Sequence, residues 1–249
     1  MNQRHRVAHQ PARGDLFDFQ VRVSQSQPQK LAPGIAGAPH NRNSLLLAHT
    51  PNGLEYPIST AMKTGGFSHV IGFDDFPFEP GHRGNVKIVG AVYAGLRLEG
   101  VISAHVRRDG RNSTQVLTRL VRHCKFYPGL QLVMLQGIAL GGFNVVDIHA
   151  LSEALALPVL VVSRRRPDLK AIQAALGKVR GGRPKWALVQ KAGDIEPVAG
   201  VWVQRCGLTL RQAEQTIQRF AVHSNIPEPL RTAHLIASGV ATGQSRARP

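Results

Sequence analysis

Beyond Gly66 the chain alternates short apolar runs with stretches of helical period, and this alternation limits the folds that are open to it. Buried strands are expected at 68–74, 130–138 and 158–163. Helices are expected at 112–125, 144–157 and 167–179. Strand–helix–strand order implies parallel pairing through right-handed crossovers. The expected core is therefore a partly parallel sheet with helices packed on it.

Two hairpins are expected to add antiparallel strands to this sheet. The first spans 86–106 and turns at 94–95, and the second joins 185–193 to 197–207. Both contain the β-branched and aromatic residues that are typical of strands. The predicted fold class is α/β, with a mixed sheet covered by helices on both faces.

Composition divides the chain near residue 62. Residues 1–61 are rich in Pro, Gln, Asn and Gly and show no sustained period, so we expect a mostly disordered extension. An alternative is that the true start of the protein is Met62, which opens the periodic region. Residues 62–242 are expected to form a single domain, and 243–249 a loose tail.

The charge balance points to a polyanionic partner. The chain has 31 Lys and Arg against 15 Asp and Glu, a formal net charge of +16, and a sequence pI of about 11.1. Nucleic acid, either DNA or RNA, is favoured over an anionic membrane surface. The structural alternative is a solvated basic surface with no specific partner. No apolar run approaches the roughly 20 residues of a membrane helix.

Cysteine usage and the N-terminus indicate a cytoplasmic protein. Cys124 and Cys206 lie far apart and outside any CxxC or Cys/His ligand spacing, which fits a reducing compartment and no structural zinc. The first residues are basic but lack the apolar segment of a secretory signal. Phosphate-loop, dinucleotide and nucleophile-elbow motifs are absent from the sequence, which disfavours those enzyme classes.

Acidic and amide side chains fall where strands are expected to end. Asp74 closes the first strand, Gln136 ends the strand before the second helix, and Asp109 precedes the first helix. The carboxyl ends of parallel strands share one edge of a sheet, where active sites gather. Carboxylates grouped there are suited to hold Mg²⁺ or Mn²⁺, since hard cations prefer oxygen ligands.

Several segments resemble one known family. These are "GFDD", "RRDG", "LQGIALGGFNVVDIHAL", "LPVLVVSRRRPDL" and "EPVAGVWVQRCGL", within about 68–245. They resemble the uncharacterised endonuclease V-like family, the domain of unknown function ninety-nine. The resemblance implies a ribonuclease H-like fold and descent from metal-dependent nucleases, whose relatives cut DNA or RNA near deaminated bases.

The resemblance also implies roles for individual residues. Asp74 matches the first metal-binding aspartate of endonuclease V, Asp109 its second acid, and Arg164 a lysine suited to hold a phosphate. Gln136 stands where the endonuclease has a third aspartate, and would orient a metal-bound water or the substrate. Because an amide is a weaker Mg²⁺ ligand than a carboxylate, two hypotheses remain. One is a nuclease with a weakened metal site, and the other is a binding module that has lost cleavage.

Further residues are candidates for phosphate contact. Arg164, Arg165 and Arg166 follow a strand directly, and Arg108 precedes Asp109. A solvated basic face is the alternative for these arginines. Gly141 and Gly142 precede a helix and would leave backbone N–H groups open to a phosphate.

Structural roles compete with the functional ones. Asp74 and Asp75 would suit a turn before Pro77. Asp147 would be an acid in the first turn of a helix capped by Asn144. The aromatic pair Phe76 and Phe78 would stack on bases or pack in the core. Five histidines show no metal-ligand spacing: His69, His105, His149, His223 and His234.

Overall fold

The computed structural model describes residues 47–48, 56–57 and 66–245 of the 249-residue chain. The strands are β1 (Leu47–Ala48), β2 (Tyr56–Pro57), β3 (His69–Asp75), β4 (Asn85–Ala94), β5 (Arg97–Arg107), β6 (Leu132–Gln136), β7 (Val159–Ser163), β8 (Glu196–Val198) and β9 (Val201–Cys206). The helices are α1 (Ser113–Arg122), the short 3-10 helix η1 (Tyr127–Gly129), α2 (Ile148–Leu155), α3 (Leu169–Leu176), α4 (Gly182–Lys191), α5 (Leu210–Phe220) and α6 (Glu228–Thr242).

The predictions for the two ends of the chain fall mostly outside this description. The disordered extension at 1–61 and the alternative start at Met62 lie outside the described residues, apart from β1 and β2, which pair antiparallel. Of the loose tail, only 243–245 is described. In the described part of the chain, no helix combines the length and apolar character needed to cross a membrane.

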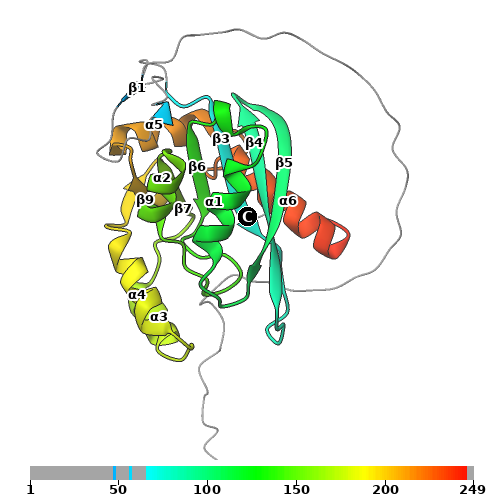
Figure 1. Cartoon of the computed structure of the whole chain (residues 1–249), viewed down its shortest axis with the longest axis vertical. Coiled ribbons are helices and arrows are strands. Elements are labelled where there is room, and N and C mark those ends of the chain that lie inside the picture. The colour runs from blue at the N-terminus through cyan, green and yellow to red at the C-terminus, as the bar shows by residue number, and fades with distance from the viewer. Residues whose placement is uncertain (1–46, 49–55, 58–65, 246–249) are drawn as a thin grey trace, which may run out of the picture.

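The larger sheet has seven strands in the order β5-β4-β3-β6-β7-β9-β8 (Figure 1). The interior strand β3 pairs parallel with the middle strand β6 and antiparallel with β4. The strand β7 continues the parallel set, and β5, β9 and β8 extend it with antiparallel pairs. This is the mixed sheet predicted from the sequence.

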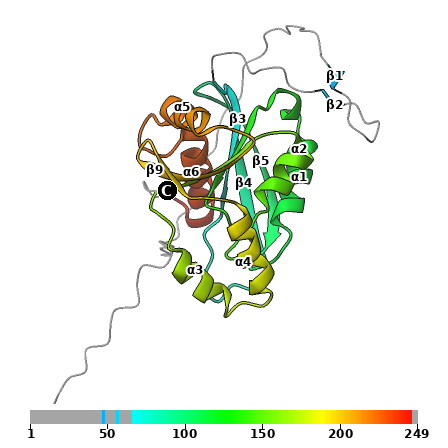
Figure 2. The same ribbon diagram turned by 90° about the vertical axis from the view of Figure 1, so that its left-hand side faces the viewer.

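Helices cover both faces of the sheet, and alternating strand residues supply the two cores. One core joins Ile71 and Phe73 of β3 to α1 and α2. The other joins Val70 to α5 and α6 on the opposite face, as Figure 2 shows. The α3–α4 pair lies at one end of the molecule in both views. The predicted fold class, α/β with a mixed sheet covered by helices on both faces, is thus confirmed.

The predicted strand at 185–193 is wrong, because this segment lies in helix α4. Its alternation of apolar and polar residues over so short a run fits a strand and a helix equally well. In the structure, Lys185 and Val189 are buried four residues apart on one helix face. The second hairpin consists instead of β8 and β9, which are joined by Ala199 and Gly200, both with positive φ.

The predicted cap of the second helix also moves. Asp147, not Asn144, is the N-cap of α2, and its carboxylate accepts hydrogen bonds from the N–H groups of His149 and Ala150. Asn144 is fully buried, and its side chain bonds to the N–H of Ser113 and to the carbonyl of Arg107. It therefore ties the loop before α2 to the start of α1.

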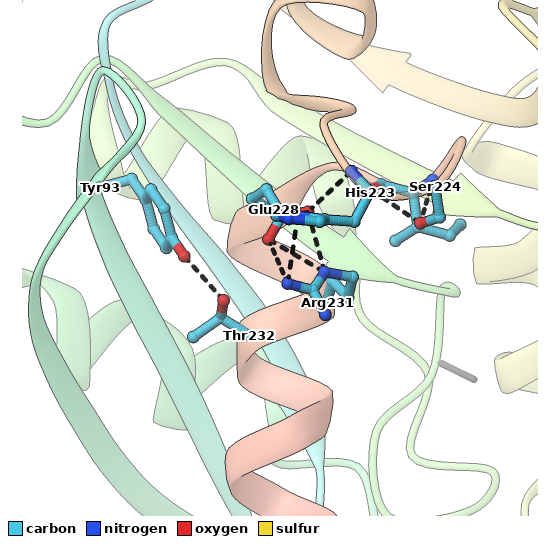
Figure 3. A network of polar contacts seen from close by, with 7 residues as sticks. Tyr93, His223, Ser224, Glu228, Arg231 and Thr232 are labelled. Carbon is cyan, nitrogen blue, oxygen red and sulfur yellow. Dashed lines mark hydrogen bonds and ion pairs between the residues drawn. The ribbon is translucent and has the colours of Figure 1, made fainter. Parts of the chain in front are cut away.

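Helix α6 sits unusually close to the sheet at Gly72. A Cβ at this position would lie 2.5 Å from the carbonyl carbon of Pro229. The first turns of α6 are also fixed by polar contacts, shown in Figure 3: Tyr93 Oη lies 2.7 Å from Thr232 Oγ1, and Arg231 donates hydrogen bonds from Nε and Nη2 to the carboxylate of the buried Glu228. These contacts determine where the later turns of α6 meet β3.

Candidate active site

Asp74 is the first residue of the site, at the carboxyl end of the interior strand β3. Its side chain is only 9% exposed and lies on the α6 face of the sheet. Oδ2 lies 2.9 Å from Nδ1 of His234 in α6, and Oδ1 accepts the N–H of Asp75 at 2.9 Å. Helix α6 thus places an imidazole against the strand-end carboxylate.

Asp75 forms a second carboxylate beside the first. Its Oδ2 accepts the N–H of Gly141 at 2.7 Å. Burial, and next to it the negative charge of Asp74, raise the pKa of the Asp75 carboxyl to about 8, although the hydrogen bond from Gly141 lowers it. Two interacting carboxyl groups at a strand end share protons as a pair, and the deprotonated pair favours a cation.

Gln136 lies next to Asp74 on the neighbouring strand. The parallel register pairs Phe73 with Leu135, so the following positions, Asp74 and Gln136, are adjacent. Met134, two residues before Gln136, belongs to the core on the α6 face, which places Gln136 on that face as well. Its Oε1 is buried and has no hydrogen-bond partner among the described residues. A buried acceptor without a donor is costly, and a cation would satisfy it.

Asp109 lies near this edge but is engaged elsewhere. It occupies a left-handed turn with φ of 50°, and its Oδ1 accepts the N–H of Phe143 at 2.8 Å. Arg108 Nε lies 3.2 Å from Oδ2. Across the described ranges, no three His, Cys, Asp or Glu side chains form a group that could hold a metal. Asp109 is thus held by the Phe143 N–H and by Arg108, and its place in a metal site with Asp74 stays a prediction.

The glycine loop is already occupied by these acids. Gly141 gives its N–H to Asp75 and accepts the N–H of Asp109 through its carbonyl at 2.9 Å, while Phe143 gives its N–H to the Asp109 carboxylate. A Cβ on Gly142, whose φ is 79°, would lie 2.5 Å from Asp109 Oδ1. The N–H groups of Gly141 and Phe143 are thus not open to a phosphate, contrary to expectation. The two glycines allow the loop to wrap around carboxylates instead.

The predicted arginines surround the same edge. Arg164, Arg165 and Arg166 are exposed directly after β7, and the Arg166 guanidinium lies 5.4 Å from the Trp202 ring centre. Arg108 donates to the carbonyl of His82 and lies 5.4 Å from the ring centre of Phe78. An open hollow lined by 80–84 and 107–109 adjoins it. These arginines can attract and orient a phosphodiester.

Two residues of the site were missed by the sequence analysis. His234 carries no recognisable ligand spacing, and its place beside Asp74 depends on how α6 docks on β3. Lys185 lay in the segment predicted to be a strand. Its side chain is buried, and Nζ donates to the carbonyl of Asp109. Burial lowers the pKa of the Lys185 ammonium. The negative charge of Asp109 nearby raises this pKa and so offsets part of the decrease.

The fold and site define an α/β protein with an acidic, arginine-rimmed centre at the carboxyl edge of its sheet. The family model described as endonuclease dU matches residues 67–241, and the chain belongs to this family. The predicted membership of an endonuclease V-like family is thereby confirmed.

Relatives cover nearly the same segment. A UPF0215 protein of Deinococcus radiodurans is 57% identical over 179 residues, which are 72% of this chain and 91% of the relative. A crystal structure of a protein of unknown function from Archaeoglobus fulgidus has 33% identity and a TM-score of 0.66, over 70% of this chain and 98% of that one. A weaker likeness is to endonuclease V of Ciona intestinalis, in complex with a 24mer DNA containing an inosine, at 13% identity and a TM-score of 0.44, over 70% and 85% of the two chains.

Proposed function

We propose that this chain is a metal-dependent endonuclease that cleaves nucleic acid beside deaminated bases, with deoxyuridine in DNA as the first substrate to test. The observation that carries the proposal is the Asp74–Asp75 carboxylate pair at the end of the interior strand β3, held by His234 and Gly141. The name of the family, endonuclease dU, supports a deoxyuridine-containing DNA substrate, and the net charge of +16 supports a nucleic acid in general.

The donor set fits a hard divalent cation. Asp74 and Asp75 would supply carboxylate oxygens, and the unpartnered Oε1 of Gln136 would supply an amide oxygen. Mg²⁺ or Mn²⁺ bound there would polarise a phosphate oxygen and lower the pKa of a bound water. With two carboxylates and one amide, the site suits a single cation better than a pair.

The protein's own groups would handle the proton and the phosphate. Because a carboxylate only accepts hydrogen bonds, His234 donates Nδ1–H to Asp74, and its Nε2 is then the basic nitrogen that takes or returns a proton. Arg164 at the end of β7 would hold a phosphate next to the carboxylate pair. Asp109 would act indirectly, by shaping the loop that holds Asp75.

A second candidate is a nucleic-acid-binding module that does not cleave. Gln136 in place of an acid favours it, as does the lack of a three-ligand metal group among the residues that the structure describes. The two functions share the carboxyl edge of the sheet and its arginines, and differ only in the chemical step. They are therefore separated by assaying cleavage and binding on the same preparation.

The test uses duplexes that are identical except for one dU, one deoxyinosine or one ordinary base, together with RNA of matching sequence. Each is incubated with Mg²⁺, Mn²⁺ or a chelator. The nuclease proposal predicts strand cleavage near dU that requires the metal and disappears in Asp74→Asn. Binding without cleavage in any metal supports the binding module. Cleavage that survives Asp74→Asn contradicts the proposed site.

A further inference from the structure

Half of the formal charge of the chain lies in one short segment. Residues 164–191, here called the basic arm, contain nine Lys or Arg and one Asp, a formal charge of +8 out of +16. The arm comprises α3, α4 and their flanking turns. All of its basic residues except Lys185 are exposed: Arg164, Arg165, Arg166, Lys170, Lys178, Arg180, Arg183 and Lys191.

The arm is attached to the loop that holds the acidic site. It leaves the sheet at the carboxyl end of β7, the strand beside β6 and Gln136. Leu176 of α3 and Val189 of α4 form an apolar cluster with Val145 of the loop before α2. Lys185 extends from α4 to the carbonyl of Asp109. The arm therefore has a fixed position relative to Asp74 and Asp75.

The charge of the arm is largely uncompensated within the described residues. Lys191 alone among its exposed basic residues forms an ion pair with a described carboxylate, that of Asp147. The one acid of the arm, Asp168, is the N-cap of α3. Lys178, Arg180 and Arg183 lie within six residues at the α3–α4 turn, where the positive end of the α4 dipole adds to their field. So dense a cluster suits the regularly spaced charges of a phosphate backbone.

We propose that the basic arm is a second nucleic-acid surface, which binds the phosphates of the duplex that flanks the cleavage site. This inference rests on the proposed function, because it takes the DNA to pass the Asp74–Asp75 edge. Figures 1 and 2 show α3 and α4 extending from that end of the sheet. At 1.5 Å per residue α3 is about 12 Å long, which corresponds to about four base pairs of duplex.

The arm variant replaces four residues outside the catalytic centre: Lys170→Gln, Lys178→Gln, Arg180→Gln and Arg183→Gln. The control variant removes four exposed charges toward the amino ends of the parallel strands: Arg97→Gln, Arg119→Gln, Lys125→Gln and Arg211→Gln. Both variants lower the net charge equally. A general effect of charge on DNA binding would therefore appear in both.

Affinity is measured by fluorescence anisotropy for dU hairpins with stems of about 8 and about 24 base pairs, over a range of salt concentrations. We expect the arm variant to bind the long stem at least tenfold more weakly and to lower its log–log salt slope by about two to three units. The control variant should change the affinity less than threefold. The short stem should be bound and cleaved alike by all three proteins.

Equal losses in the arm and control variants would overturn the inference, as would wild-type affinity that does not increase with stem length. Retention of the wild type, but not of the arm variant, on phosphatidylserine vesicles without any DNA effect would assign the arm to a membrane surface instead. Failure of the wild type to bind or cleave even the short stem would refute the proposed function itself. The two failures are thus distinguishable.

Discussion

His234 Nδ1 lies 2.9 Å from Asp74 Oδ2, which joins the C-terminal helix to the carboxyl end of the interior strand β3. The two residues are 160 positions apart in the sequence. The imidazole is positioned by the same helix whose close approach at Gly72 and polar contacts at Glu228 and Thr232 fix it on the sheet. Packing of α6 and chemistry at Asp74 are therefore coupled.

Replacing His234 by Ala should reduce cleavage by about 10²-fold or more, since it removes the proposed proton carrier. The free energy of unfolding should fall by about 1–3 kcal/mol, because Asp74 remains buried without this partner. Cleavage is measured on the dU duplex, and stability by urea titration.

The matched control for His234→Ala is Thr232→Val, on the same helix. This change removes the hydrogen bond to Tyr93 and should cost about 1 kcal/mol of stability, yet leave cleavage per folded molecule unchanged. If both variants lose cleavage equally, His234 acts only through the stability of α6.

The pH dependence of stability should reveal Asp75. Its pKa is raised to about 8 in the folded state, whereas the unfolded carboxyl has an ordinary pKa near 4. Between these values the folded state holds a proton that the unfolded state has lost. Stability without metal should therefore decrease as the pH rises toward 8, by up to about 1.4 kcal/mol per pH unit.

Asp75→Asn removes that titration but keeps an oxygen that accepts the Gly141 N–H. The metal-free variant should thus show a flatter stability profile between about pH 5 and 8 than the wild type. Parallel profiles for the two proteins, measured by urea titration in chelator, would show that Asp75 titrates normally.

Gly72→Ala should displace α6, because the new Cβ would meet the backbone of Pro229 at 2.5 Å. We expect a loss of about 1–3 kcal/mol and a loss of cleavage, since His234 would shift away from Asp74. The control is Gly239→Ala in α6, where the new Cβ would meet no atom closer than 3.6 Å. This change should be neutral or stabilising by up to about 1 kcal/mol. A variant Gly72→Ala with normal stability and cleavage would contradict the coupling.

Gln136→Asp places a third carboxylate beside Asp74 and should tighten Mn²⁺ binding and raise cleavage. Without a metal the same change crowds negative charge, so stability in chelator should fall as the pH rises. Gln136→Met, which removes the amide oxygen but keeps the bulk, should weaken Mn²⁺ binding. An aspartate that destabilises the protein and adds no metal affinity would contradict the site.

The sequence could predict the sheet because buried strands and helices space their apolar residues with periods of two and 3.6 residues. Asp74 and Gln136 could be placed at one edge for the same reason, since each ends an apolar strand. The helix at 182–191 was missed because a short run with few apolar residues fits both periods. There, burial of Lys185 and Val189 against neighbouring segments decides the structure.

The remaining parts of the site depend on tertiary contacts. No local pattern shows that His234 meets Asp74, because the docking of α6 depends on Gly72 and on the contacts of its first turns. The engagement of Asp109 by the N–H of Phe143 depends on a left-handed turn that forms only when the glycine loop folds over it. Sequence reasoning placed Asp109 near the edge but could not orient its carboxylate.

Calorimetric titration of Mn²⁺ into the full chain at pH 7 shows whether Asp74 and Asp75 bind a cation. With the pKa of Asp75 at about 8, the metal must displace a proton. Runs in two buffers of different ionisation enthalpy should therefore show release of close to one proton. Asp74→Asn should abolish the binding, and Asp75→Asn should abolish the proton release. No Mn²⁺ binding by the wild type, or unchanged binding by Asp74→Asn, would contradict the account.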